Sequence, residues 1–335
     1  MTITRRERLL TALAHQQPDV TPWQIDLTSE AREATAAFLG HPDLELEIGN
    51  HLAHVGDGWF EDLGNHRWRD NFGVVWNRSI DRDIGNVETL LLPEPDLANY
   101  RFPEPDLARN GRRLEQMLAE SEGIFTAGGI GFSMFERAWT LRGMENLLMD
   151  MVLAPAFVDE LLDRILEYNL RALDHMLQFP VDCIRFGDDW GQQHGLIMGP
   201  RLWRRFIKPR VAQMYARVKA AGRFVMQHSC GDITELLPDL IDMGLDVFNT
   251  FQPEVMDVDW VKREYGQHLS FYGGISTQQV LPRIAPQDVR AHVLDMIARV
   301  GTDGGYLVGP THAIPRDVPP ETIVALIDAV QTQHG

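Results

Sequence analysis

From residue 123 onward, short apolar runs alternate with longer stretches in which apolar residues recur every three or four positions. The short runs are typical of buried strands and the longer stretches of amphipathic helices, so the pattern predicts repeated βα units. We expect strands at residues 124–129, 183–187, 224–228, 247–250, 270–273 and 306–308. We expect helices at residues 154–179, 200–221, 233–243, 286–300 and 319–333.

The first 120 residues are less regular. They predict an amphipathic helix at residues 4–17, a strand at 23–27, a hairpin around 73–78 and a proline-rich surface connection at 92–106. The strand at 23–27, and one strand that the pattern does not locate, bring the expected number to eight. We therefore predict an α/β fold, a TIM (β/α)8 barrel, as one domain over residues 1–335. Its N-terminal part, residues 1–120, is expected to be irregular, and residues 121–335 form the regular repeats.

Composition narrows the class of protein. The chain has 335 residues, of which 44% are hydrophobic and 24% charged, as in ordinary globular proteins. The formal net charge of −17 argues against nucleic-acid and anionic-membrane partners. No apolar run approaches the roughly 20 residues of a membrane span, and no signal-peptide core follows the N-terminus. With two cysteines in the chain, we expect a reducing, cytoplasmic environment.

Polar residues follow five of the expected strands. The carboxyl ends of the strands carry the chemistry of eight-stranded barrels, so these residues are candidates for a site at one mouth. An open doubly wound sheet would place polar residues similarly, but no Gly-x-Gly-x-x-Gly loop stands at a strand–helix junction. We expect substrate contacts from Trp190, Gln192, Gln227, Asn249, Gln252, Glu254 and Tyr272.

His228 and Cys230 are the strongest candidates for chemistry. Residues two apart on a strand point to one face, so an imidazole and a thiolate can reach one ion. Alone, the pair is weak, because buried cysteines and histidines often have purely structural roles. His312 follows the last strand, which a closed barrel brings round beside the first. One Cys and two His would leave zinc an open fourth position, as in catalytic sites. Alternatively, His312 hydrogen-bonds its own loop or binds a substrate carboxylate.

Asp188 and Asp189 form an adjacent acidic pair at the end of one expected strand. They diverge if the strand ends there, so either could orient substrate or act as the fourth zinc ligand. The alternative is structural, in which they cap the loop or pair with Arg185.

The chain resembles the uroporphyrinogen decarboxylase superfamily and, within it, the cobalamin-dependent methyltransferase branch. The likeness runs through residues 5–13 (RRERLLTAL), 18–22 (PDVTP) and 70–76 (DNFGVVW), and is strongest over residues 228–320. The resemblance implies a TIM barrel and zinc bound by the His-x-Cys pair and a later cysteine. In this chain the later position, within residues 309–315 (GPTHAIP), is His312. The decarboxylases also carry a histidine there, without metal.

The resemblance implies zinc-dependent methyl transfer between a small thiol, methoxy or methylamine-type substrate and a corrinoid. A partner corrinoid protein is expected to carry the methylcobalamin, because the chain has no Asp-x-His-x-x-Gly segment. Porphyrinogen decarboxylation is not expected, because the family's arginine-rich motif is missing after Pro22. One alternative is a metal-free decarboxylase or lyase acting on a small carboxylate, with His312 as acid or electrostatic clamp and Asp189 orienting the reacting group. Another is a non-catalytic ligand-binding barrel. Family members are often dimers, so a homodimer is also an expectation.

Overall fold

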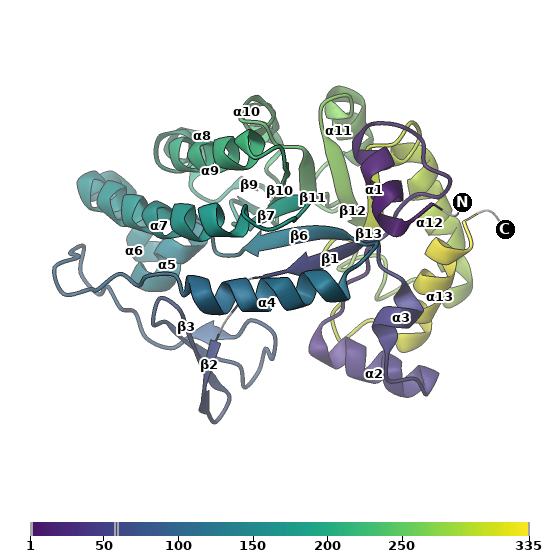
Figure 1. Cartoon of the computed structure of the whole chain (residues 1–335), viewed down its shortest axis with the longest axis horizontal. Coiled ribbons are helices and arrows are strands. Elements are labelled where there is room, and N and C mark those ends of the chain that lie inside the picture. Colours follow the sequence, from purple (N-terminus) through teal and green to yellow (C-terminus); the bar gives the residue numbers. More distant parts are fainter. Residues whose placement is uncertain (1–2, 57, 59, 334–335) are drawn as a thin grey trace.

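A computed structural model of the chain describes residues 3–56, 58 and 60–333. Its central feature is a curved parallel sheet with strand order β1-β6-β7-β10-β11-β12-β13 (Figure 1). The strands are β1 Leu52–Val55, β6 Phe125–Ile130, β7 Cys183–Gly187, β10 Phe224–His228, β11 Val247–Thr250, β12 Ser270–Ile275 and β13 Tyr306–Pro310. The six strands expected after residue 123 are therefore confirmed, three of them with unchanged bounds.

The segment 23–27 closes the sheet. Trp23 and Leu27 form parallel bridges with Val308 and Ile314, beside β13. On the other side, the His51 N–H donates to the Trp23 carbonyl at 3.0 Å, directly before β1. The strand at 23–27 thus consists of bridges rather than a continuous ladder, and the strand that the pattern did not locate is β1. Together they complete an α/β barrel of the TIM type.

The N-terminal end of the barrel is filled with apolar side chains. The first residues of several strands, among them Leu52, Phe125 and Cys183, cluster there with Leu9 and Leu13. The last two belong to α1 (Arg5–Leu13), which covers this end of the barrel. The opposite end, where the strands finish, is left for a site.

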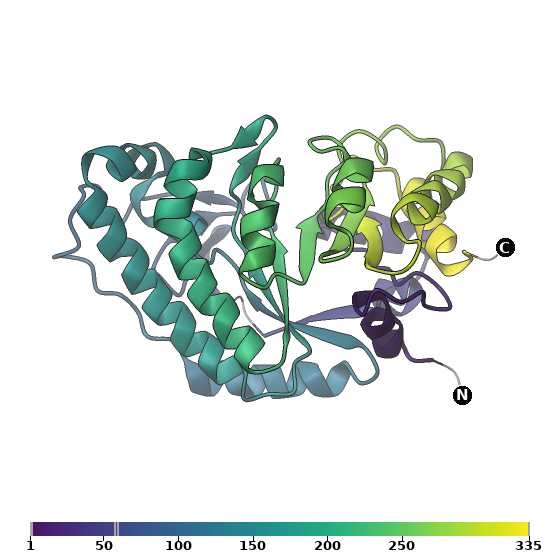
Figure 2. The same cartoon turned by 90° about the horizontal axis from the view of Figure 1, so that it is seen from above.

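The helices alternate with the barrel strands, and Figure 2 shows long helices side by side around the barrel. They are α1 Arg5–Leu13, α2 Ser29–Leu39, α3 Leu44–Ile48, α4 Leu107–Glu120, α5 Phe135–Arg142, α6 Met144–Leu153, α7 Pro155–Met176, α8 Gly199–Leu202, α9 Lys208–Ala220, α10 Leu237–Asp242, α11 Val258–Tyr265, α12 Pro286–Val300 and α13 Pro320–Gln331. The helix expected at residues 200–221 is interrupted by a π-helical segment, Trp203–Ile207, between α8 and α9. The helix expected at 4–17 ends at Leu13, and His15 has a positive φ of 52°.

The chain between β1 and β6 is more regular than expected. It forms an antiparallel sheet with order β2-β3-β4-β5, and then α4. Its strands are β2 Phe60–Gly64, β3 Arg67–Asp70, β4 Val75–Asn77 and β5 Asn86–Val87. The hairpin expected around residues 73–78 is confirmed, because β4 pairs with β3. Residues before 121 therefore add an antiparallel sheet and also supply β1 to the barrel.

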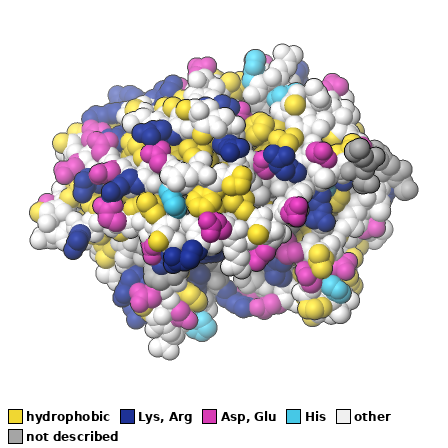
Figure 3. All heavy atoms as spheres, in the orientation of Figure 1, with side chains coloured by type: hydrophobic (Ala, Val, Ile, Leu, Met, Phe, Trp, Pro, Cys, Tyr) yellow, Lys and Arg dark blue, Asp and Glu magenta, His cyan; other side chains and the backbone are white. Residues whose placement is uncertain are grey.

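The surface carries mixed charge. Figure 3 shows basic and acidic side chains interspersed over the face in view. Among the helices of the described residues, none is both long and apolar enough to cross a membrane.

Candidate metal centre in the barrel mouth

His228, Cys230 and His312 come together at the carboxyl ends of β10 and β13. One potential ligand atom from each lies within 4.8 Å of the other two. His228 Nε2 is 3.7 Å from Cys230 Sγ, and the rings of His228 and His312 are 5.5 Å apart, edge to face. His228 and Cys230 are half-buried, whereas His312 is exposed. A soft sulfur and two imidazole nitrogens at this separation match the donors that zinc takes in proteins.

Asn249 on β11 fixes the orientation of the His228 ring. His228 Nδ1 lies 2.6 Å from Asn249 Oδ1, and Asn249 Nδ2 donates to the Tyr272 carbonyl at 3.1 Å. The second bond identifies the Asn249 oxygen as the acceptor, so the proton of a neutral His228 ring is on Nδ1. The Nε2 lone pair is then free and directed toward Cys230. Burial, followed by the charges of Arg185 and His312, lowers the pKa of His228 and favours this neutral form.

Asp189 lies beside the same ligands. Its Oδ1 accepts the Cys230 N–H at 2.8 Å and is 3.9 Å from His228 Nε2. Burial, followed by this carboxylate, raises the pKa of the Cys230 thiol. Without a bound cation the thiol therefore stays protonated, and a cation at the site would favour the thiolate.

Two glycines allow the loops that follow β7 and β10 to approach closely. A Cβ at Gly231 would lie 2.3 Å from the carbonyl carbon of Gly191, and one at Gly191 would lie 2.7 Å from the Cys230 carbonyl oxygen. Gly231 also has a φ of +81°, which disfavours other residues. Gln252 accepts the Gly231 N–H at 2.7 Å and so holds the turn that carries Cys230.

Asp188, expected as a partner of Asp189 in catalysis, has a structural position. It is fully buried and accepts the N–H groups of Met134, Phe135 and Glu136 at 2.8–3.2 Å, at the start of α5. The Trp190 indole donates to it at 2.6 Å. Asp188 therefore caps the start of α5, which is the structural role that the sequence left open for it, and both of its oxygens are occupied by these donors.

Five of the seven expected substrate contacts do not line the cavity at the mouth, and one of them, Gln252, holds the turn at Gly231 as described above. Gln227 points outward because it alternates with His228, and it accepts the Tyr215 hydroxyl at 2.7 Å. Trp190 is fully buried and packs against Trp203. Gln192 is exposed on the hairpin formed by β8 (Gly191–Gln192) and β9 (Gly195–Leu196), and Glu254 accepts a hydrogen bond from Ser276. Their positions in the sequence placed these residues near strand ends but did not show whether their side chains point into the cavity.

His228 and His312, but not Cys230, line a cavity with a volume of about 230 Å³. Of the expected residues, His228, His312, Asn249 and Tyr272 line it. Three charged or ionisable residues that the sequence pattern did not indicate also line it, namely Asp26, His54 and Arg185. A usable signal was present, since Asp26 and Arg185 interrupt apolar strands at positions that alternate to the inside.

Asp26 is held by its neighbours in this cavity. It accepts hydrogen bonds from Gln24 Nε2 and the Tyr272 hydroxyl, each at 2.9 Å, and lies 3.5 Å from His54 Nε2. Burial opposes its ionisation, but the bonds from His54, Gln24 and Tyr272 outweigh burial and hold the pKa of its carboxyl below the usual range. Asp26 is therefore a fixed negative charge in the cavity wall.

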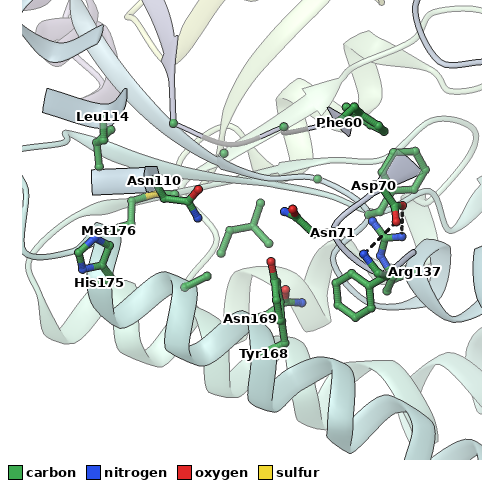
Figure 4. Close-up of a pocket in the computed structure, with 18 residues that line it drawn as sticks. Phe60, Asp70, Asn71, Asn110, Leu114, Arg137, Tyr168, Asn169, His175 and Met176 are labelled. Atoms are coloured by element: carbon green, nitrogen blue, oxygen red, sulfur yellow. Dashed lines mark hydrogen bonds and ion pairs between the residues drawn. The ribbon is translucent and has the colours of Figure 1, made fainter. Parts of the chain in front are cut away.

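A second cavity, of about 220 Å³, lies outside the barrel between α4 and α7 (Figure 4). Asn110, Tyr168 and His175 line it together with the ion pair between Asp70 and Arg137. It contains none of the residues that the sequence indicated for chemistry.

Comparisons with known proteins agree with this architecture. Residues 114–333 match the model of the family described as "Uroporphyrinogen decarboxylase (URO-D)". The chain is 22% identical over 263 residues to a uroporphyrinogen decarboxylase of Methylococcus capsulatus, covering 74% of this chain and 69% of that protein. A Coxiella burnetii uroporphyrinogen decarboxylase is 22% identical over 180 residues, which is 53% of this chain and 48% of that one.

Among solved structures, a methyltransferase from Methanosarcina mazei is similar over 100% of both chains, with a TM-score of 0.76 and 18% identity. This similarity confirms the barrel fold. Because the family model covers well over half of the residues, the chain belongs to the uroporphyrinogen decarboxylase family.

Proposed function

We propose that this protein is a zinc-dependent enzyme that transfers a methyl group between a small substrate and a corrinoid carried by a partner protein. The observation that carries the proposal is the convergence of ligand atoms from His228, Cys230 and His312 within 4.8 Å. This donor set suits zinc, and three protein ligands leave a position for substrate. Zinc bound there would supply Lewis-acid activation of the heteroatom that carries or receives the methyl group.

The chain's own residues prepare the site. Asn249 holds the proton of His228 on Nδ1 and leaves Nε2 for the metal. Asp189 lies beside Cys230 and His228, so it is the acidic residue that we assign to orienting the substrate or to the fourth ligand position. Asp188 acts indirectly, because it fixes the start of α5 and the loop that continues into Asp189.

The corrinoid partner is expected to dock at the barrel mouth, where the three ligands lie. The fold of the Methanosarcina mazei methyltransferase, which spans this whole chain, supports the choice of methyl transfer. The substrate that we propose is a small thiol, methoxy or methylamine-type molecule. We place the enzyme in the cytoplasm, because Cys183 and Cys230 are both free thiols.

Decarboxylation of a tetrapyrrole fits the cavity poorly. The cavity in the barrel mouth has a volume of about 230 Å³, which is below the range of roughly 300–1,000 Å³ found for ordinary ligand pockets. Among the described residues that line it, Arg185 is the one Arg or Lys. A substrate with many carboxylates needs several such partners. A decarboxylase acting on a small carboxylate remains the alternative that the experiments must separate from methyl transfer.

The activity can be tested with free methylcobalamin as the methyl donor and a panel of small thiols as acceptors. The zinc-loaded protein is expected to convert methylcobalamin and thiol to demethylated cobalamin and methyl thioether, measured by cobalamin absorbance and mass spectrometry. Cys230→Ala should abolish turnover, and Cys183→Ala, which changes the other cysteine, should retain it. Absence of thioether with every thiol, together with release of CO₂ from small carboxylates, would replace this proposal with the decarboxylase.

A further inference from the structure

Arg185 occupies an unusual position in the barrel. It is the central residue of β7, Cys183–Gly187, in which the other four residues are buried. Cys183, two residues earlier, belongs to the apolar cluster inside the barrel, so Arg185 faces the interior as well. It lines the same cavity as His228 and His312. The cationic side chain of Arg185 therefore lies inside the barrel, between the apolar cluster at its N-terminal end and the candidate metal centre.

The structure gives this cation no partner. Within residues 3–56, 58 and 60–333, no hydrogen bond or ion pair involves Arg185, and its Nε atom is fully buried without an acceptor. Asp26, the carboxylate that lines the cavity, is instead bound by Gln24 and Tyr272 and lies near His54. Asp189 Oδ1 accepts the Cys230 N–H. Arg185 is only partly buried, but its Nε is buried without an acceptor, which is costly, and an anion that enters the cavity would offset that cost.

The strand register shows how far the backbone of Arg185 lies from the level of His228 along the barrel strands. Arg185 pairs with Met226, whereas Gly187 pairs with His228. Arg185 is thus two residues deeper in the barrel, which corresponds to about 7 Å along the strands. The cavity of about 230 Å³ is lined by Arg185 as well as by His228 and His312, so it suits a short molecule with an anionic group at one end and a reacting heteroatom at the other.

We propose that Arg185 binds the carboxylate of a small anionic substrate whose thiol, methoxy or amine end reacts at His228, Cys230 and His312. This inference rests on the proposed function and narrows its substrate class from any small methyl donor or acceptor to one that carries a carboxylate. A planar guanidinium pairs with a carboxylate through two parallel hydrogen bonds, so it also orients the substrate chain toward the mouth.

The test uses 3-mercaptopropionate and its uncharged amide, 3-mercaptopropionamide, titrated calorimetrically into the zinc-loaded protein. Wild type is expected to bind the carboxylate about 10–100-fold more tightly than the amide, as for one charge-assisted pair. Arg185→Met should remove this preference while leaving zinc content and amide affinity unchanged. Arg223→Met is the matched control, because Arg223 Nε is also buried without a partner but precedes β10 at the opposite end of the barrel.

Arg185→Gln serves as a second variant if Arg185→Met fails to fold, with circular dichroism as the check. Equal affinity of wild type for the two probes, or a carboxylate preference that persists in a folded Arg185 variant, would overturn the inference. Propionate, titrated into the metal-free protein, separates the two proposals. If zinc never binds but propionate binds through Arg185, the carboxylate site stands and zinc-dependent methyl transfer fails. If zinc binds and no anion preference appears, the carboxylate site alone fails.

Discussion

His228 Nδ1 lies 2.6 Å from Oδ1 of Asn249, and this contact determines which ring nitrogen of His228 faces Cys230. The Asn249 amide is in turn oriented by its bond to the Tyr272 carbonyl. Residues of β11 and β12 therefore fix the orientation of His228. The third proposed ligand, His312, comes from the end of β13. A histidine that binds a metal through one ring nitrogen usually donates a hydrogen bond from the other nitrogen to a fixed oxygen, as His228 does here.

Replacing Asn249 with Leu should weaken zinc binding about 10–100-fold, because the His228 ring loses the acceptor that fixes its tautomer. Competition with a chromophoric chelator measures the affinity. Asn169→Leu is the matched control, since Asn169 is also a buried, hydrogen-bonded amide but lies on α7. Equal zinc affinity of wild type and Asn249→Leu would remove Asn249 from the metal site.

Gly231→Ala should also impair zinc binding, because the added Cβ would collide with Gly191 and displace the turn that carries Cys230. The control is Gly222→Ala, which has a comparable φ of +67° but no atom within 4 Å of the added carbon. Both variants should lose about 1–2 kcal/mol of stability from the left-handed backbone. Only Gly231→Ala should lose zinc affinity. A similar affinity in the two variants would show that the close approach of the loops is not needed.

Asp70→Asn should destabilise the fold by about 3–5 kcal/mol, because it leaves the buried Arg137 charge unpaired. Asp70 also accepts the N–H groups of Phe72 and Val74 and the Trp76 indole, which explains why residues 70–76 form a compact motif. Urea denaturation measures the change. Glu33→Gln, which breaks an exposed pair with Arg82, should have no measurable effect. A loss for Asp70→Asn as small as that of the control would contradict this role.

The sequence was sufficient for most of the barrel but for only part of the site. Apolar runs bounded by glycine identified six strands, because parallel strands that are buried on both faces consist almost entirely of apolar residues. The four-residue β1 was missed since His54 interrupts its apolar pattern. The spacing of two predicted that His228 and Cys230 lie together, and their Nε2 and Sγ atoms are 3.7 Å apart, although Cys230 lies in the turn after β10 and not on the strand. The facing of Gln227 and the capping role of Asp188 depend on neighbouring elements, which single-sequence patterns do not contain.

His51 provides a pH-dependent prediction. It is fully buried against Trp23 with both ring nitrogens unpaired, and burial, followed by the charges of Arg8 and Arg5, lowers its pKa to about 3. The unfolded chain takes up a proton near pH 6.5, so this contribution is complete above that pH and is lost progressively toward pH 3.

The free energy of unfolding should therefore fall between pH 6.5 and 5 by up to about 1.4 kcal/mol per unit from this group. His51→Phe should show a flatter slope than wild type in urea titrations across that interval. The same slope in wild type and His51→Phe would mean that His51 does not carry this dependence.

The most direct test of the central claim is the metal content of the purified protein, prepared without a metal-affinity column and measured by plasma mass spectrometry. We predict about one zinc per chain in wild type and in Cys183→Ala, and none in Cys230→Ser. Wild type that contains no zinc, even after zinc is supplied and the excess removed, would contradict the account. A Cys230→Ser variant that keeps its zinc would contradict the assignment of the metal to His228, Cys230 and His312.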